Sequence, residues 1–118
     1  TYNIKYIMIQ QFDSLDDFNN LINNVSDKYI VIDFSASWCI PCKKVYPEYE
    51  KLSEKDEYIK NCYFYKVDVD ELSDLSEHLG VSRMPTFFIY YNKEKVYEMT
   101  GTKLSNIETF LSEAISSS

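Results

Sequence analysis

Two cysteines lie in the stretch Trp38-Cys39-Ile40-Pro41-Cys42, shortly after the apolar run Tyr29-Ile30-Val31-Ile32-Asp33-Phe34. The apolar run is too short for an independent helix and too continuously apolar for a surface strand. It therefore predicts a central strand that is buried on both faces. The residues that follow Cys42 are compatible with a helix, so the motif marks a junction between a strand and a helix.

The position of the two cysteines at this junction has a chemical consequence. Cys39 would lie at the helix N-terminus and Cys42 one turn inside it, where their sulfurs can approach bonding distance without unwinding the helix. The unpaired N–H groups of the first helical turn also favour a thiolate on Cys39. The sequence therefore predicts a dithiol that forms and breaks an internal disulfide.

Two other interpretations of the Cys-x-x-Cys motif are open. A structural zinc site would need two further ligands, and the only other cysteine and histidine are Cys62 and His78. A purely structural disulfide is the second alternative. A bond between Cys39 and Cys42 closes too small a loop to restrict the unfolded chain much, so a purely structural disulfide would add little stability.

Length and composition predict one globular domain over residues 1–118. The chain has 45% hydrophobic and 26% charged side chains and only 2 glycines and 3 prolines, and it shows no internal repeat or linker. The 12 basic and 19 acidic side chains give a formal net charge of −7, which argues against nucleic acid or an anionic membrane as the main partner. We expect a monomer.

The cysteine content bears on the compartment. Three cysteines cannot make a disulfide framework of the kind found in small secreted domains, although a single redox pair works in either type of compartment. The chain begins at Thr1 and shows no signal-peptide hydrophobic region, which a trimmed chain would have lost. The expectation is a cytoplasmic protein.

Periodicity and turn residues divide the chain into alternating strands and helices. The helix that carries the cysteines is interrupted at Pro47, where a kink is expected. This order implies a mixed sheet covered by helices on both faces. The predicted elements are a strand at Ile4–Ile9, a helix from Ser14 to Val25, the central strand Tyr29–Phe34, the cysteine helix, a strand at Tyr63–Val69, a short helix between Asp70 and Gly80, strands at Thr86–Tyr91 and Lys95–Met99, and a helix from Leu104 to Ile115.

Several boundaries follow from capping and turn chemistry. Ser14 begins a capping box, and Asp70 is the expected N-cap of the short helix. Gly80 can end that helix in the left-handed conformation. The predicted hairpin turns at Asn92 and Lys93 without the favoured glycine, so Asn92 would supply much of the tolerance for positive φ.

With these residues in view, the chain closely resembles the thioredoxin family. The resemblance covers nearly the whole domain, and its specificity lies in the order and separation of its parts. It implies an α/β thioredoxin fold with three layers, α/β/α, around a mixed five-stranded sheet with about four helices, and a single thioredoxin domain at 1–118. The matching segments are Val31 to Lys43, which contains the motif, then Pro47, Lys66-Val67-Asp68-Val69-Asp70, Met84-Pro85-Thr86 and Gly101.

The resemblance implies a catalytic role for four residues. Cys39, exposed at the helix start, would attack the substrate disulfide, and Cys42 would resolve the mixed disulfide. Asp33 would transfer a proton for Cys42, with Lys66 nearby on the neighbouring strand. An ionised carboxylate is costly inside an apolar strand, so burial should raise the pKa of Asp33. The alternative is that Asp33 is simply a buried acid paired with Lys66.

The resemblance also implies a substrate-docking patch around the cysteines. Pro85 matches the family's cis-proline, whereas an ordinary trans proline at a strand edge is the alternative. The backbone of Met84 would then pair with an extended substrate chain. Trp38, although tryptophan is more often a core residue, would lie on the surface. The complete expected patch is Trp38, Ile40, Pro41, Met84, Pro85 and Gly101.

Ile40 is the main departure from the family pattern, because the commonest signature has glycine there. Its branched side chain leaves partner choice and redox potential open. Pro41 favours a reductase, because oxidising relatives usually carry histidine at that position. Ser35 and Lys93 are lesser departures. Cys62 matches no catalytic position in the family and is expected to be a buried thiol, with regulatory oxidation or dimer formation as the alternative for an exposed one.

The function implied by the resemblance is reduction of protein disulfides, as part of electron transport and cell redox homeostasis. No bound organic cofactor or metal is expected. The reducing equivalents would come from NADPH through a thioredoxin reductase, and the other partners would be protein disulfide substrates. A partner-binding module with little turnover, or a disulfide oxidase or isomerase, is the alternative function.

Overall fold

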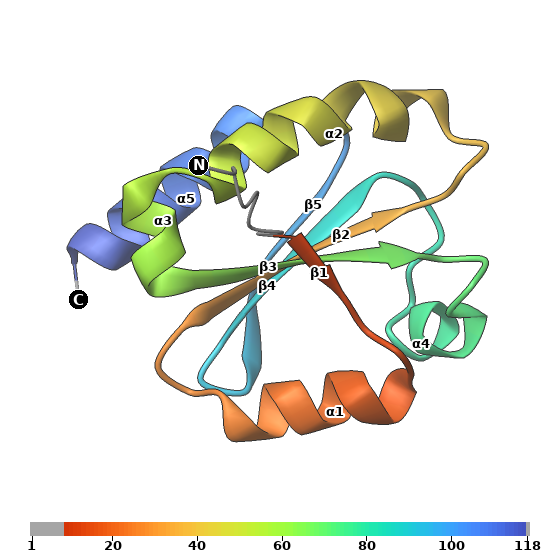
Figure 1. The fold of residues 1–118 in the computed structure, drawn as a ribbon, viewed down its shortest axis with the longest axis horizontal. Coiled ribbons are helices and arrows are strands. Elements are labelled where there is room, and N and C mark those ends of the chain that lie inside the picture. Colours follow the sequence, from red (N-terminus) through yellow and green to blue (C-terminus); the bar gives the residue numbers. More distant parts are fainter. Residues whose placement is uncertain (1–8, 118) are drawn as a thin grey trace, which may run out of the picture.

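The computed structural model describes residues 9–117, in which five strands and five helices form an α/β/α sandwich (Figure 1). The strands run in the order β1-β3-β2-β4-β5 across one sheet. The element bounds are β1 Ile9–Gln11, α1 Leu15–Asn24, β2 Tyr29–Ser35, α2 Ile40–Ser53, α3 Asp56–Asn61, β3 Cys62–Asp68, α4 Ser73–His78, β4 Thr86–Tyr91, β5 Glu94–Thr100 and α5 Leu104–Ser116.

Strand β2 is the centre of the sheet, as its apolar sequence predicts. It pairs in parallel with β3 and antiparallel with β4, so the sheet is mixed. From Ile30 to Ser35 every residue of β2 is buried. A strand covered on both faces has no solvent side, which explains why its sequence shows no polar alternation.

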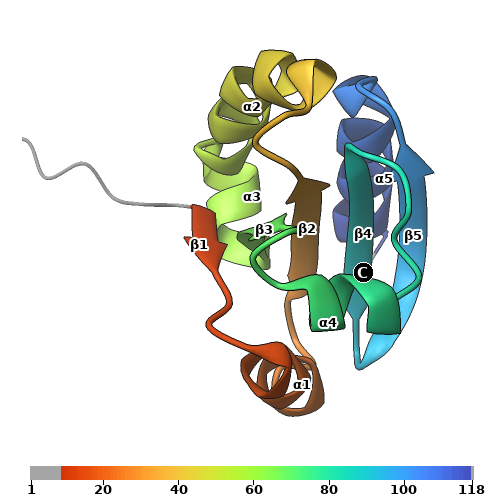
Figure 2. The same ribbon diagram turned by 90° about the vertical axis from the view of Figure 1, so that its right-hand side faces the viewer.

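Two separate cores lie on the two faces of the sheet, because alternate residues of each strand point to opposite faces. Val31 of β2 packs with residues of α2, α3 and α5, whereas Ile32 packs with residues of α1 and α4. In Figure 2, α1 and α4 lie at the bottom of the view and α2 at the top, whereas α5 is seen behind β4. Asp33 shares the face of Val31, so its side chain points to the α2 side.

The N-terminal half agrees with the predicted elements except at two places. Ser14 is the N-cap of α1, where its hydroxyl accepts a hydrogen bond from the Asp17 N–H at 3.0 Å, so the predicted capping box start is confirmed. The first strand, predicted at Ile4–Ile9, is observed at Ile9–Gln11, so it ends two residues later than predicted; residues 4–8 of the prediction lie outside the described residues. The expected number of about four helices is one too low, because the six-residue helix α3 also forms between α2 and β3.

The predicted N-cap of the short helix is wrong. Helix α4 begins after Leu72, which provides no side-chain cap, and Asp70 lies outside the helix. Its carboxylate instead accepts a hydrogen bond from the indole of Trp38. Gly80 has φ of +72°, which confirms the left-handed residue expected after this helix.

The hairpin between β4 and β5 turns at Asn92 and Lys93, which have φ of 51° and 72°. Both residues therefore adopt the left-handed conformation that glycine usually supplies in such turns. The prediction assigned positive φ chiefly to Asn92, but Lys93 has a positive φ as well. Substituting a glycine for Lys93 would relieve this local restriction without touching the other end of the sheet.

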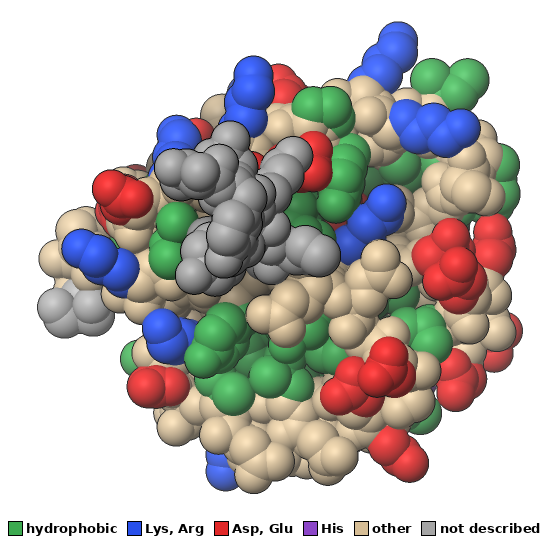
Figure 3. All heavy atoms as spheres, viewed as in Figure 1, with side chains coloured by type: hydrophobic (Ala, Val, Ile, Leu, Met, Phe, Trp, Pro, Cys, Tyr) green, Lys and Arg blue, Asp and Glu red, His purple; other side chains and the backbone are tan. Residues whose placement is uncertain are grey.

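Acidic side chains gather on one part of the surface. Figure 3 shows acidic side chains gathered on the right of one face, where Figure 1 places α4. Within residues 9–117, no helix has the length and apolar character needed to cross a membrane.

Candidate active site

The two motif cysteines are joined by a disulfide at the N-terminus of α2. Their Cα atoms are 5.3 Å apart, and Cys39 is the N-cap residue of the helix. The backbone N–H of Cys42 points to the Cys39 sulfur at 3.2 Å. Pro41 fits in the first helical turn because the N–H that it lacks would have no partner there. This geometry agrees with the internal disulfide predicted from the spacing.

Cys39 is less accessible than predicted. It is only 5% exposed, so the expectation of an exposed cysteine is wrong for this disulfide form. The reason is local packing, since Cys39 and Cys42 form a small apolar cluster with Ala36, against which Met84 also packs. A substrate must therefore reach the sulfur across the side chains that surround it.

Two residues next to Cys39 in the sequence, Trp38 and Ile40, have exposed side chains. Trp38 is 64% exposed and Ile40 65% exposed, which excludes a core role for the tryptophan. The Trp38 indole N–H donates a hydrogen bond to the Asp70 carboxylate at 2.9 Å, so the ring is tied to the loop after β3. Two large apolar side chains on the surface of a small domain are typical of an interaction site.

The loop before β4 lies against the disulfide. The Met84–Pro85 peptide bond is cis, as the family resemblance implies, and Pro85 is buried while Met84 is half-buried. The Gly101 N–H donates a hydrogen bond to the Pro85 carbonyl at 2.9 Å. The structure thus places Gly101 beside Pro85, and brings Met84 against the cysteine cluster.

Asp33 lies buried beneath α2 and has no hydrogen-bond partner for either carboxylate oxygen among the described residues. Its pKa is raised to about 7 because burial penalises the charged form, while the positive charge of Lys66 acts in the opposite direction. A carboxyl group with this pKa exchanges its proton near neutral pH. Asp33 is therefore suited to acid–base chemistry.

Lys66 is the register partner of Asp33 on β3, as its predicted position requires. Within the described part of the chain, however, no ion pair or hydrogen bond joins the two side chains. The Lys66 ammonium instead lies 4.3 Å from the centroid of the Tyr46 ring. Asp33 and Lys66 therefore form no direct ion pair in this structure, although the Lys66 charge still acts to lower the Asp33 pKa.

A hollow of about 260 Å³ connects this region with the second cysteine. Tyr46 lies one turn after Cys42 on α2, so their side chains share a helix face. Sequence reasoning did not identify Tyr46 as a site residue, although its spacing from Cys42 could have done so. The lining residues are Ser35, Ala36, Ser37, Cys42, Lys43, Tyr46, Lys66 and Asp68.

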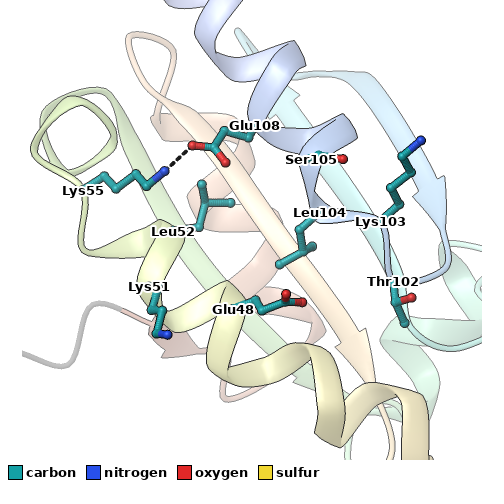
Figure 4. Close-up of a pocket in the computed structure, with 9 residues that line it drawn as sticks. All are labelled: Glu48, Lys51, Leu52, Lys55, Thr102, Lys103, Leu104, Ser105 and Glu108. Atoms are coloured by element: carbon teal, nitrogen blue, oxygen red, sulfur yellow. Dashed lines mark hydrogen bonds and ion pairs between the residues drawn. The ribbon is translucent and has the colours of Figure 1, made fainter.

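Two further hollows continue from the motif along α2 and α5. One of about 240 Å³ contains Ile40, Pro41 and Thr102 in its lining. It shares Thr102 and Glu48 with a larger hollow of about 580 Å³ between the two helices (Figure 4). In Figure 4, Leu52 and Leu104 face each other across this hollow, and the ion pair of Lys55 with Glu108 crosses one end of it.

Cys62 lies apart from this site at the start of β3. It is 4% exposed, and burial raises its pKa to about 12, so the expectation of a buried thiol is confirmed. Residues 9–117 contain no cluster of three or more potential ligand side chains arranged to hold a metal ion. Both motif cysteines are occupied by their mutual disulfide.

Comparison with known proteins identifies the family. The family model described as Thioredoxin matches residues 10–113. A thioredoxin of Ictalurus punctatus is 42% identical over 94 residues, which cover 80% of this chain and 87% of the relative. A thioredoxin of Coprinus comatus is 42% identical over 108 residues, which cover 92% of this chain and 99% of the relative.

Solved structures give the same result. The crystal structure of a Malassezia sympodialis thioredoxin has a TM-score of 0.84 and 33% identity, and the match covers 98% of this chain and 97% of that one. A Plasmodium falciparum thioredoxin has a TM-score of 0.77 and 31% identity, with 89% of this chain and 98% of that one covered. The fold of this chain is thus shared with solved thioredoxins. The chain belongs to the thioredoxin family.

Proposed function

We propose that this thiol–disulfide oxidoreductase reduces protein disulfides with Cys39 as the attacking thiolate and Cys42 as the resolving thiol. The observation that carries the assignment is the Cys39–Cys42 disulfide at the N-terminus of α2. There the first-turn N–H groups favour negative charge, and the N–H of Cys42 points at the sulfur of Cys39. Cys39 is also the nearer of the two to the exposed side chains of Trp38 and Ile40.

The reaction proceeds through a mixed disulfide. In the first step the Cys39 thiolate attacks one sulfur of the substrate disulfide; a new S–S bond forms, the substrate S–S bond breaks, and the second substrate sulfur leaves as a thiolate that takes up a proton. In the second step the Cys42 thiolate attacks the Cys39 sulfur, and the remaining substrate thiolate leaves. The chain's dithiol has lost two electrons, and the substrate disulfide has gained them.

Asp33 is proposed to accept the proton of the Cys42 thiol in the second step. The raised pKa of Asp33, about 7, allows it to receive and release a proton near neutral pH. Cys42 lines the hollow beside α2 together with Ser35, which lies on the same face of β2 as Asp33. Lys66, the register partner of Asp33, adds a positive charge whose position tunes this proton transfer.

Substrate docking is proposed on the patch of Trp38, Ile40, Pro41, Met84, Pro85 and Gly101. Its support is the exposure of the first two side chains and the position of Met84 against the cysteine cluster. An extended substrate segment would add as a short strand along the backbone of Met84. Ile40 would then contact the residue beside the substrate cysteine and restrict which partners fit.

The electron donor, oligomeric state and compartment belong to the same proposal. Thioredoxins act without a bound cofactor, and we infer that NADPH supplies electrons through a thioredoxin reductase. A monomer suffices, because both redox sulfurs come from one chain. A cytoplasmic role in redox homeostasis is supported by the third cysteine, which is buried and builds no disulfide framework.

Replacing Cys42 with serine is expected to trap the mixed disulfide, because the hydroxyl cannot attack the Cys39 sulfur. The measurement is mass spectrometry of the complexes formed with a disulfide-containing protein such as native insulin, with and without reductant. A control variant, Cys39→Ser with Cys42 intact, should capture far less. If the Cys42→Ser protein forms no complex that reductant releases, Cys39 is not the attacking thiol.

A further inference from the structure

The side chain of Lys66 lies against an aromatic ring, although its neighbour in the sheet is a buried acid. Asp33 and Lys66 face each other in the β2–β3 register, and alternate-residue geometry places both side chains on the α2 side of the sheet. Yet both oxygens of Asp33 lack a hydrogen-bond partner among the described residues. The ammonium of Lys66 lies over the Tyr46 ring, 4.3 Å from its centroid.

We propose that Tyr46 is a positioning residue that holds the Lys66 ammonium over its ring and away from the buried carboxyl group of Asp33. The proposal rests on the proposed proton-transfer role of Asp33 and adds a residue that controls it. A cation over an aromatic face is attracted by the ring quadrupole, and the attraction strengthens where water is partly excluded. Tyr46 and Lys66 are both half-buried in the lining of the same hollow.

The other ionisable groups around Asp33 do not replace this arrangement. The Tyr49 hydroxyl, on α2, is already hydrogen-bonded to the carbonyl oxygens of Val31 and Tyr65, at 3.2 and 2.8 Å. From β4, the register partner of Asp33 is Phe87, which carries no charge. The remaining ionisable groups that line the hollow are Cys42 and Lys43 from α2 and Asp68 at the end of β3.

The hydroxyl of Tyr46 itself stays neutral in this setting. Burial raises its pKa, and the nearby Glu50 and Asp33 raise it further. The ring, rather than a phenolate charge, is therefore the feature that attracts Lys66. If the ring is removed, Lys66 is free to turn toward its register partner, and an opposite charge within about 4–6 Å lowers the pKa of a carboxyl group by about 1–3 units.

The test is the pKa of Asp33, followed by the carbon-13 resonance of its carboxyl group as pH is varied in the oxidised protein. In Tyr46→Leu the pKa should fall by about one unit or more. In the control Tyr46→Phe, which keeps the ring, it should stay at the value of the unsubstituted protein. An equal fall in both variants would overturn the proposal, as would no fall in either.

Water entering the space left by the ring would also lower the Asp33 pKa, and the Lys66→Met background separates that cause. If Lys66 is responsible, adding Tyr46→Leu to Lys66→Met leaves the Asp33 pKa unchanged. A fall of the same size in that background would contradict the proposal. This comparison isolates the coupling between the two residues.

A second measurement can be made on the unsubstituted protein. Protons on the terminal methylene of a lysine held over an aromatic ring resonate upfield of their position in a free chain, because of the ring current. The Lys66 signals should show this shift in the unsubstituted protein and lose it in Tyr46→Leu. Unshifted signals in the unsubstituted protein would overturn the proposal whether or not the variants fold.

The outcome is separable from the proposed role of Asp33. The pH profile of the Cys42 resolution step should move down with the Asp33 pKa in Tyr46→Leu. A lower pKa with an unmoved profile would support the positioning by Tyr46 and contradict the proton-transfer role. An unmoved pKa would contradict the positioning alone.

Discussion

Replacing Cys39 with serine is expected to lower the rate of protein-disulfide reduction by about a thousandfold or more. The thiolate is the nucleophile of the exchange, and a serine hydroxyl does not ionise near neutral pH. No other described cysteine can take its place, because Cys42 is the third residue inside the helix and Cys62 is buried on another part of the sheet. The measurement is the rate at which the protein catalyses reduction of the disulfides of native insulin by dithiothreitol.

Cys62→Ala is the matched control for this loss. Cys62 is 4% exposed, and burial raises its pKa to about 12, so it carries almost no thiolate at neutral pH. The control should therefore keep the full turnover rate once its folding is verified by circular dichroism. If Cys39→Ser retained a substantial part of the activity, or if Cys62→Ala lost it, the assignment of the attacking thiol would be wrong.

The second large effect is on stability: Asp33→Asn should raise the free energy of unfolding at pH 8 by about 2 to 4 kcal/mol. The pKa of Asp33 is about 7 in the folded protein, against 3.8 for the ordinary carboxyl group. The folded state therefore holds the proton more tightly than the unfolded state. The stability associated with this group is fully present below pH 3.8 and is lost as pH rises through about 7.

Asparagine resembles the neutral acid at every pH, so the gain should depend on pH in this direction. At pH 4 the variant and the unsubstituted protein should differ by less than about 1 kcal/mol. Urea unfolding of the oxidised proteins at both pH values measures this difference. A gain that is equal at pH 4 and pH 8, or a loss at pH 8, would contradict the buried, proton-holding state of Asp33.

The same substitution should slow one chemical step more than the other. Asparagine cannot accept the Cys42 proton, so resolution of the mixed disulfide at neutral pH should slow more than the initial attack by Cys39. Single-turnover kinetics with a fluorescent disulfide substrate separates the two steps. Equal effects on both would mean that Asp33 does not serve Cys42 in particular.

The central strand and the dithiol could be predicted from the sequence because each rests on a local pattern. The apolar run of β2, in which Asp33 is the one charged residue, has no stable place except between two helical layers. The spacing of Cys39 and Cys42 is one helical turn, and the disulfide follows from it. Ser14 was equally predictable, because its capping of α1 involves only residues of the same turn.

The features that could not be predicted depend on contacts between distant segments. Asp70 is a good N-cap by residue type, but the Trp38 indole, 32 residues away in sequence, takes its carboxylate instead. Helix α3 is six residues long and has no side-chain cap, so its propensity signal is weak, and its buried Tyr58 anchors it in the core below α2 and α5. Lys66 could be placed beside Asp33 by register, but its preference for the Tyr46 ring required the packed structure.

The most direct test of the account is the reversible redox equilibrium of the Cys39–Cys42 pair. The purified protein would be equilibrated across a series of thiol and disulfide ratios, trapped with an alkylating agent and read by mass for each cysteine. The account predicts a two-electron transition confined to Cys39 and Cys42, with a strongly reducing midpoint near the family reference of about −270 mV, and an unchanged Cys62. A midpoint near the roughly −120 mV of strong disulfide oxidants, or no reversible disulfide, would contradict a disulfide reductase.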